Sequence, residues 1–120
     1  MHERIRFINH QGKQILFVDF SNCSADAVQT IARTVPDYVT PQPRASVLIL
    51  TDFAGASFDR DALLAMKESA VFDKPFVKKS ALIGTESLPK DSYEAIKNFS
   101  RRELPTFETR EEALAWLVRD

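Results

Sequence analysis

Three side chains that could carry out chemistry follow predicted strands of this chain: Asp19, Asp52 and Thr85. In open α/β sheets, ligands usually bind in the loops at the carboxyl ends of the strands. Phosphoryl transfer with Mg²⁺ also needs clustered carboxylates to hold the metal and a lysine to hold the phosphoryl group. The chain has no acidic pair after its first parallel strand and no lysine beside Phe107. We therefore predict that Asp19 and Asp52 cap their own loops by accepting hydrogen bonds from nearby backbone N–H groups.

Hydroxyl side chains are concentrated near the predicted helix starts. They are Ser21, Ser24, Ser57, Thr85 and Ser87. A helix N-terminus attracts anions, so a phosphate or a lipid headgroup could bind there. Helix capping explains the same residues without a ligand, and we favour it because capping residues occur at most helix starts.

A nucleophilic pair is not expected from the positions of Cys23 and the two histidines. Such a pair would need a histidine beside Ser21, Cys23 or Ser57. His2 is terminal, and His10 lies in a predicted turn away from the carboxyl-end loops. Structural zinc sites need several His or Cys ligands. We predict that the protein is not an enzyme and carries no metal or other cofactor.

Length and charge set further bounds on function. A chain of 120 residues suggests one domain, spanning residues 1–120. The formal net charge of −1 gives no reason to expect nucleic-acid binding. No apolar run approaches the ~20 residues of a membrane span, and the N-terminus lacks the apolar segment of a secretory signal. A single cysteine fits a reducing compartment, so we predict a cytoplasmic protein.

Residues 46–57 are the stretch around which the other elements are placed. Residues 47–50 are an unbroken apolar run, which is typical of a strand buried on both faces in the middle of a sheet. Gly55 lies in the following loop, and an amphipathic pattern begins at Asp59. Four further strands are predicted at residues 4–8, 13–20, 76–84 and 105–108, the last one short and at a sheet edge.

Four helices are predicted between and after these strands. Ser24, Ser87 and Thr109 are expected to cap the first, third and fourth helices. The second helix is expected to begin near Asp59, with Asp59 and Asp61 at the positive end of its dipole. Pro36 is expected to bend or end the first helix, and residues 73–75 end the second. Arg101 and Arg102 are placed in the last turn of the third helix, where cations complement the helix dipole. The predicted fold is α/β in the order β-β-α-β-α-β-α-β-α, with one mixed, mostly parallel sheet of about five strands.

The central strands are apolar on both sides, whereas right-handed crossovers would gather the helices on one side. Either a crossing helix or a second copy of the chain must cover the other side, and we therefore predict a homodimer. The second helix has an unusually wide apolar face made of Leu63, Leu64, Met66, Val71 and Phe72. It could line a pocket for an acyl chain, form a dimer interface or belong to the core, and core is the favoured single explanation.

Three stretches of the chain resemble the STAS domain, found in sulfate transporters and anti-sigma-factor antagonists. They are residues 15–21 ending in Asp-Phe-Ser, residues 50–57 (Leu-Thr-Asp-Phe-Ala-Gly-Ala-Ser) and residues 107–117. Within that group the chain is similar to stand-alone bacterial proteins described as STAS-like or CRAL-TRIO-like. In the antagonists a phosphorylatable serine opens the helix after the central strand. Here Asp59 or Asp61 lies about where that serine would be, and Ser57 is the nearest hydroxyl.

The resemblance implies a non-enzymatic regulatory or protein-interaction module. We expect it to act through residues of the carboxyl-end loops. They are Asp19, Ser21, Asp52, Gly55, Ser57, Asp59, Asp61 and Thr85. The alternative is a small-molecule binding protein for a lipid-like or anionic ligand, as the CRAL-TRIO likeness implies. The expected partners are a second copy, an unidentified protein or a lipid-like ligand.

Overall fold

The computed structural model describes residues 4–119. Its elements in chain order are β1 (Ile5–His10), β2 (Lys13–Asp19), α1 (Ala25–Val39), β3 (Val47–Asp52), α2 (Arg60–Asp73), β4 (Val77–Ile83), α3 (Lys90–Ser100) and α4 (Arg110–Val118). Two single 3₁₀ turns, η1 (Lys74–Phe76) and η2 (Thr85–Ser87), precede β4 and α3. Within residues 4–119, none of these helices combines the length and the apolar character needed to cross a membrane.

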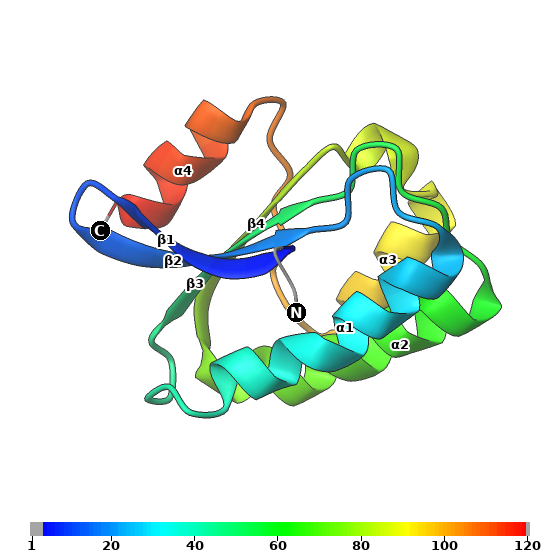
Figure 1. Cartoon of the computed structure of the whole chain (residues 1–120), viewed down its shortest axis with the longest axis horizontal. Helices are drawn as coiled ribbons and strands as arrows, with labels where there is room; N and C mark the ends of the chain where they lie inside the picture. Colours follow the sequence, from blue (N-terminus) through cyan, green and yellow to red (C-terminus); the bar gives the residue numbers. More distant parts are fainter. Residues whose placement is uncertain (1–3, 120) are drawn as a thin grey trace.

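The strands form one sheet in the order β1-β2-β3-β4 (Figure 1). β1 pairs antiparallel with β2, whereas β2, β3 and β4 are parallel to one another. In this register Asp19 lies opposite Asp52, and Asp52 lies opposite Ile83. The loops that follow β2, β3 and β4 therefore leave the sheet at the same edge.

The prediction of a fifth strand at residues 105–108 is wrong, since the described sheet has four strands. Only Thr106 pairs with the edge strand, as an isolated parallel bridge to Leu82. The carbonyl oxygen of Pro105 accepts from Leu82 N (2.9 Å), and Phe107 N donates to Leu82 O (2.8 Å). The pairing stops there because the Phe107 ring packs against Trp116 of α4, with ring centres 5.6 Å apart. The chain therefore turns away from the sheet after two hydrogen bonds.

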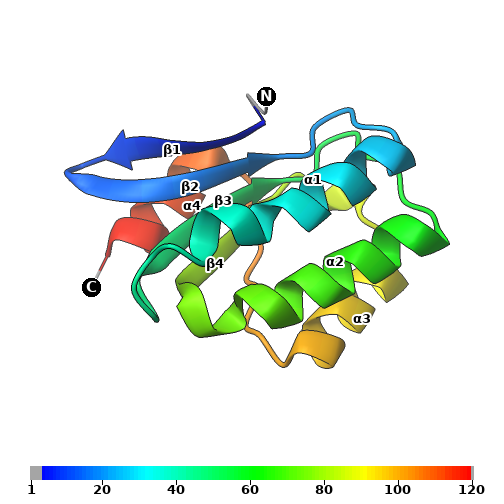
Figure 2. The same cartoon turned by 60° about the horizontal axis from the view of Figure 1, so that its bottom comes forward.

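Both faces of the sheet are covered by helices of the same chain (Figures 1 and 2). α1, α2 and α3 pack on one face, and α4 packs alone on the other. The buried residues on the α4 side are Ile15, Phe17, Leu48, Leu50, Ala81 and Ile83 of the sheet, with Ala113, Leu114 and Leu117 of α4. The crossing helix is thus the correct alternative, and this face gives no reason to require a second copy.

Phe17 shows how a short helix can complete this second layer. Its side chain is buried although it lies near the edge of the sheet. The guanidinium carbon of Arg110 lies 4.6 Å from the Phe17 ring centre, and that of Arg6 lies 4.9 Å from it. Each cation–π contact at such a site contributes about 0.5–1 kcal/mol, and the aliphatic stems of the two arginines also cover apolar surface.

Two of the three predicted helix caps, Ser24 and Thr109, are confirmed, and Asp59, expected near the start of α2, is the N-cap of that helix. Ser24 Oγ accepts from Ala27 N (3.2 Å), Asp59 Oδ1 accepts from Ala62 N (2.8 Å), and Thr109 Oγ1 accepts from Glu112 N (3.1 Å). Each bond satisfies one of the N–H groups that a helix start leaves without an intrahelical acceptor.

The other helix predictions need two corrections. Pro36 does not end α1, because the helix continues to Val39. Val39 is fully buried, and Thr40 N still donates to Pro36 O (3.0 Å), so core packing holds the last turn despite the missing N–H. Ser87 does not cap α3, whose N-cap position is Pro89 without a side-chain hydrogen bond. Ser87 lies in η2 instead.

Leu117 of α4 is 1% exposed, so truncating its side chain should leave a cavity beneath the helix. If α4 covers its face of the sheet, Leu117→Ala should therefore lower the free energy of unfolding by about 2–5 kcal/mol. Leu64→Ala is the matched control, because Leu64 is 44% exposed and its loss should be within about 1 kcal/mol. Urea denaturation of both variants measures the difference. Equal losses in the two variants would contradict the assignment of these two positions.

Candidate functional site

The loops after β2 and β3 are held side by side by backbone hydrogen bonds. Asn22 N donates to Ala54 O (2.8 Å), and Ser57 N donates to Cys23 O (2.9 Å). The first bond continues the pairing of the two strands beyond their ends. The second reaches from the start of α2 to the start of α1. The two loops thus form one continuous layer at the carboxyl edge of the sheet.

The loop after β4 joins this layer on its other side. Phe53 N donates to Ile83 O (3.0 Å), and Gly55 N donates to the hydroxyl oxygen of Ser87 (2.7 Å). The Ser87 oxygen, predicted to cap α3, therefore ties η2 to the loop after β3. We call residues 20–24, 53–59 and 84–87 together the loop surface.

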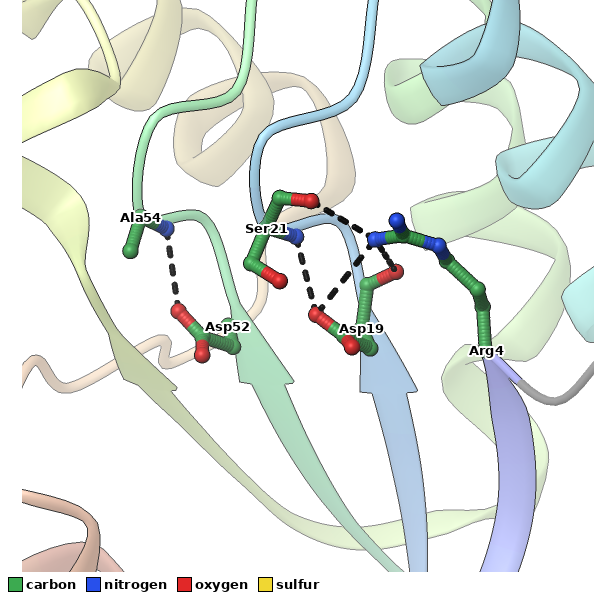
Figure 3. Close-up of polar contacts among 5 residues, drawn as sticks. All are labelled: Arg4, Asp19, Ser21, Asp52 and Ala54. Carbon is green, nitrogen blue, oxygen red and sulfur yellow. Dashed lines mark hydrogen bonds and ion pairs between the residues drawn. The ribbon is translucent and has the colours of Figure 1, made fainter.

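Asp19 and Asp52 hold equivalent positions beneath this surface (Figure 3). Asp19 Oδ1 accepts from Ser21 N (2.9 Å), and Asp52 Oδ1 accepts from Ala54 N (2.9 Å). Each carboxylate thus fixes the turn that follows its own strand, which confirms the loop-capping interpretation. Each carboxylate thus has one oxygen committed to its own backbone.

Arg4 connects the start of β1 to the same edge (Figure 3). Its Nη1 donates to Ser21 O (2.6 Å) and lies 3.8 Å from Asp19 Oδ1. The ion pair is partly exposed, so its own contribution to stability is small. The hydrogen bond to the carbonyl matters more here, since it fixes the backbone of the loop after β2.

Gly84 makes the close approach of the β3 and β4 loops sterically feasible. It has a φ of +68°, and a Cβ at this position would lie 2.4 Å from Ala54 N and 2.7 Å from Asp52 Oδ1. Both neighbours are fixed, one by the backbone and the other by its hydrogen bond to that backbone. A side chain at residue 84 would therefore push the two loops apart.

The groups that the loop surface presents to solvent come mainly from the start of α2. Ser57, Asp59 and Asp61 are exposed, whereas Thr85 is half-buried in η2. Asp59 is the N-cap of α2, so one of its oxygens is used within the helix. Ser57 and Asp61 are thus an exposed hydroxyl and an exposed carboxylate on either side of that cap, and Glu86 of η2 is a second exposed carboxylate.

Cys23 lies directly below this surface and is buried. Burial raises the pKa of its thiol, while the nearby Arg4 acts in the opposite direction and Asp19 adds to the rise. A raised pKa disfavours the thiolate that a nucleophilic cysteine needs. His10 ends β1 at the opposite edge of the sheet and is not brought near this thiol.

The wide apolar face predicted for α2 is split in the structure. Leu63 and Met66 are half-buried and pack on the core, whereas Leu64, Val71 and Phe72 are exposed at 44%, 45% and 57%. The five residues therefore do not line one pocket. The side of α2 turned to the core consists of smaller residues, namely Ala62, Ala65, Ser69, Ala70 and Asp73.

A cavity of about 60 Å³ lies between the sheet and helices α1, α2 and α3. Its wall is mostly apolar, and Met66 is the member of the predicted apolar face that reaches it. Polar side chains enter the wall from the sheet, from α2, from α3 and from the segment after α3. They are Thr51, Ser69, Asp73, Ser80, Tyr93 and Arg102.

Asp73 is the unusual group in this wall, since it is a carboxylic acid only 3% exposed. Ser69 Oγ donates to its Oδ2 (3.1 Å), but Oδ1 has no hydrogen-bond partner within residues 4–119. Burial raises the pKa of Asp73 to about 6, against the opposing effects of Ser69 and Arg102. The folded chain therefore keeps one uncompensated acceptor inside its core.

Arg102 lies beyond α3, which ends at Ser100, so it does not occupy the predicted last turn. Its Nη1 donates to Ala70 O at the end of α2 (3.3 Å). Burial lowers the pKa of the guanidinium, and the negative charge of Asp73 acts to raise it. Asp73 and Arg102 were not among the predicted site residues. The available signal was spacing, because residues 62, 65, 69 and 73 repeat at helical intervals and place Asp73 on the buried side of α2.

No protein-family model matches this chain, and no curated protein matches it. Among solved structures, this chain is similar to an uncharacterised protein of the DUF3478 family from Shewanella loihica PV-4, described as having a SpoIIAA-like fold. The similarity covers 94% of this chain and 91% of that one, with a TM-score of 0.72 and 16% sequence identity. This chain has a SpoIIAA-like fold. That fold is the one found in STAS domains, so the predicted resemblance is confirmed at the level of fold.

Gly84→Ala should disrupt the loop surface of this SpoIIAA-like chain and lower the free energy of unfolding by more than about 2 kcal/mol, because the added Cβ meets fixed atoms. Gly12→Ala is the matched control, since Gly12 also has a positive φ (+80°) but would place its Cβ in open space. Its cost should be about 1 kcal/mol. Thermal or urea denaturation compares the two. A Gly12 variant as unstable as the Gly84 variant would mean that φ alone sets the cost.

Asp73→Asn should stabilise the protein at pH 8 by up to about 2–3 kcal/mol and by much less at pH 4. The folded-state pKa of about 6 lies above the value near 4 of an unfolded chain, so the folded state holds this proton more tightly. Wild-type stability should therefore fall between about pH 4 and pH 6 relative to the variant. Urea denaturation across this range measures the difference, with exposed Asp37→Asn as the control. Parallel pH profiles of wild type and Asp73→Asn would contradict the burial of an unpaired carboxylate.

Proposed function

We propose that this chain is a regulatory module of STAS type that binds a protein partner through its loop surface and catalyses no reaction itself. The observation that carries the proposal is the pre-formed state of that surface. Three loops from three strands are fastened to one another by hydrogen bonds such as Asn22 N to Ala54 O and Gly55 N to Ser87 Oγ. An interface that is already ordered loses little conformational entropy on binding.

The charge of this end of the molecule supports a partner with a basic surface. Helices α1, α2 and α3 all start here, and their first turns and the adjoining loops carry exposed charges. The acidic ones are Asp26, Asp59, Asp61, Glu86 and Asp91, and the basic ones are Arg60 and Lys90. Three helix N-termini add the equivalent of about +1.5, so a net negative charge is left. Complementary charge mainly raises the rate of association.

The chemistry of the same residues speaks against catalysis at this site. Asp19 and Asp52 are committed to their own turns, and the pKa of the Cys23 thiol is raised. The accessible groups, Ser57 and Asp61, lie on opposite sides of the helix cap and do not form a nucleophile with its base. Assembly into a homodimer stays a prediction within this proposal.

A paired charge reversal tests the proposal. Asp61→Lys with Glu86→Lys should reduce partner retention at least about tenfold in cross-linking pull-downs from the cell of origin, because it inverts the charge of the loop surface. Asp37→Lys with Glu103→Lys is the matched control, since it makes the same change in net charge at exposed positions near the other ends of α1 and α3.

The control pair should retain the same protein as wild type. Equal retention by wild type and both pairs would contradict binding through the loop surface. Loss in both pairs would mean that net charge, and not this surface, governs retention.

A further inference from the structure

We infer that the cavity between the sheet and helices α1, α2 and α3 is a binding site for a small neutral molecule that carries a hydroxyl group on a short apolar body. This inference is independent of the proposed partner surface. α2 begins at the loop surface and ends at Asp73, so that surface and the polar end of the cavity lie at opposite ends of one helix. The cavity extends from Asp73 toward the loops, where Phe20 and Phe53 also line it.

The polar end of the cavity lacks one hydrogen bond, which a ligand could supply. Asp73 Oδ1 is buried, lies in the cavity wall and has no partner within the described part of the chain. A buried acceptor left without a donor destabilises the folded state, and more so when the group is charged. Ser69 cannot supply the missing bond as placed, because its single hydroxyl proton is directed to Oδ2.

Other polar groups in the wall define what the ligand head must offer. Arg102 supplies guanidinium donors, and Thr51 and Ser80 supply hydroxyls from neighbouring strands. An ammonium head would be repelled by Arg102, and a carboxylate head would be repelled by Asp73. A hydroxyl fits both, since it donates one proton to Asp73 Oδ1 and can accept from a donor on the other side.

The size and the remaining wall define the rest of the ligand. A cavity of about 60 Å³ has room for about four to six water-sized groups, since each needs about 10–15 Å³ of this measure. Beyond the polar end the wall is aliphatic and aromatic, with residues such as Val18, Val35 and Ile96. A body of three to five carbon atoms, on the same reckoning, suits that space.

The cavity also has a plausible entrance. Most of its lining side chains are buried, but Met66, Tyr93 and Arg102 are only half-buried. They come from α2, from α3 and from the segment after α3. Tyr93 Oη donates a hydrogen bond to Leu104 O (2.8 Å), which fixes its side chain. A small displacement of Met66 or Arg102 is therefore the simplest way to open this side of the cavity to solvent.

Two isomers of one formula test the inference on the unmodified protein. 1-Butanol and diethyl ether contain the same atoms, but only the alcohol can donate to Asp73. In methyl-resolved NMR titrations, 1-butanol should shift the Val18, Val35 and Ile96 signals saturably, with half-saturation at a concentration at least about tenfold lower than for the ether. Intermolecular NOEs from the butanol methyl to these residues should place it inside.

Equal half-saturation by the two isomers would overturn the inference. So would a lack of saturation, or shifts confined to exposed residues such as Leu64; the cavity would then hold water only. Asp73→Leu should abolish the preference for the alcohol, whereas Asp37→Leu, on the exposed side of α1, should keep it. If the Asp73→Leu variant still prefers 1-butanol over diethyl ether, the assignment of Asp73 is overturned. If this variant does not fold, the comparison of the two isomers on the unmodified protein still decides the inference.

Discussion

The parallel register that sets Asp19 opposite Asp52 is the constraint on which the loop surface depends. It ends both strands at the same level, so the two turns that the carboxylates fix through their local hydrogen bonds start side by side. A slip of one residue in either strand would turn that strand's carboxylate toward the other face of the sheet. The hydrogen bonds between the loops would then be lost together.

The two layers of helices explain why such a register can be maintained. A strand that is apolar on both faces gains from burial only if both faces are covered, and α4 covers the second face with three buried side chains. On the face covered by α1, α2 and α3, the side chains at the core are mainly apolar, but at Asp73 helix α2 brings a carboxylate to the core. Natural proteins usually retain such a destabilising group for function or specificity rather than for stability. The fold therefore combines a rigid surface at one end of α2 with a local weakness at the other.

Much of the fold could be predicted from short-range patterns. The predicted features are the apolar run at residues 47–50, the capping residues Ser24 and Thr109, and the turn-forming carboxylates. Each depends on contacts within a few residues along the chain. The predictions that were wrong concern residues whose conformation is set by contacts with residues elsewhere in the sequence. Residues 105–108 have the pattern of a strand, but Phe107 is drawn to Trp116. Ser87 has the pattern of a cap, but its oxygen accepts from Gly55. The cavity was missed because a helix-ending Asp-Lys-Pro sequence does not disclose that its Asp faces the core.

Amide hydrogen exchange most directly tests whether hydrogen bonds hold the loops of the loop surface together. The N–H groups of Ser21, Asn22, Ala54 and Ser57 are in loops, yet each donates to an acceptor within the layer. These four N–H groups should exchange at least about 100-fold more slowly than those of an open loop, at rates close to those in β3. Exchange as fast as at Gly12, in the exposed turn between β1 and β2, would show that the loops are not held together and would contradict the account.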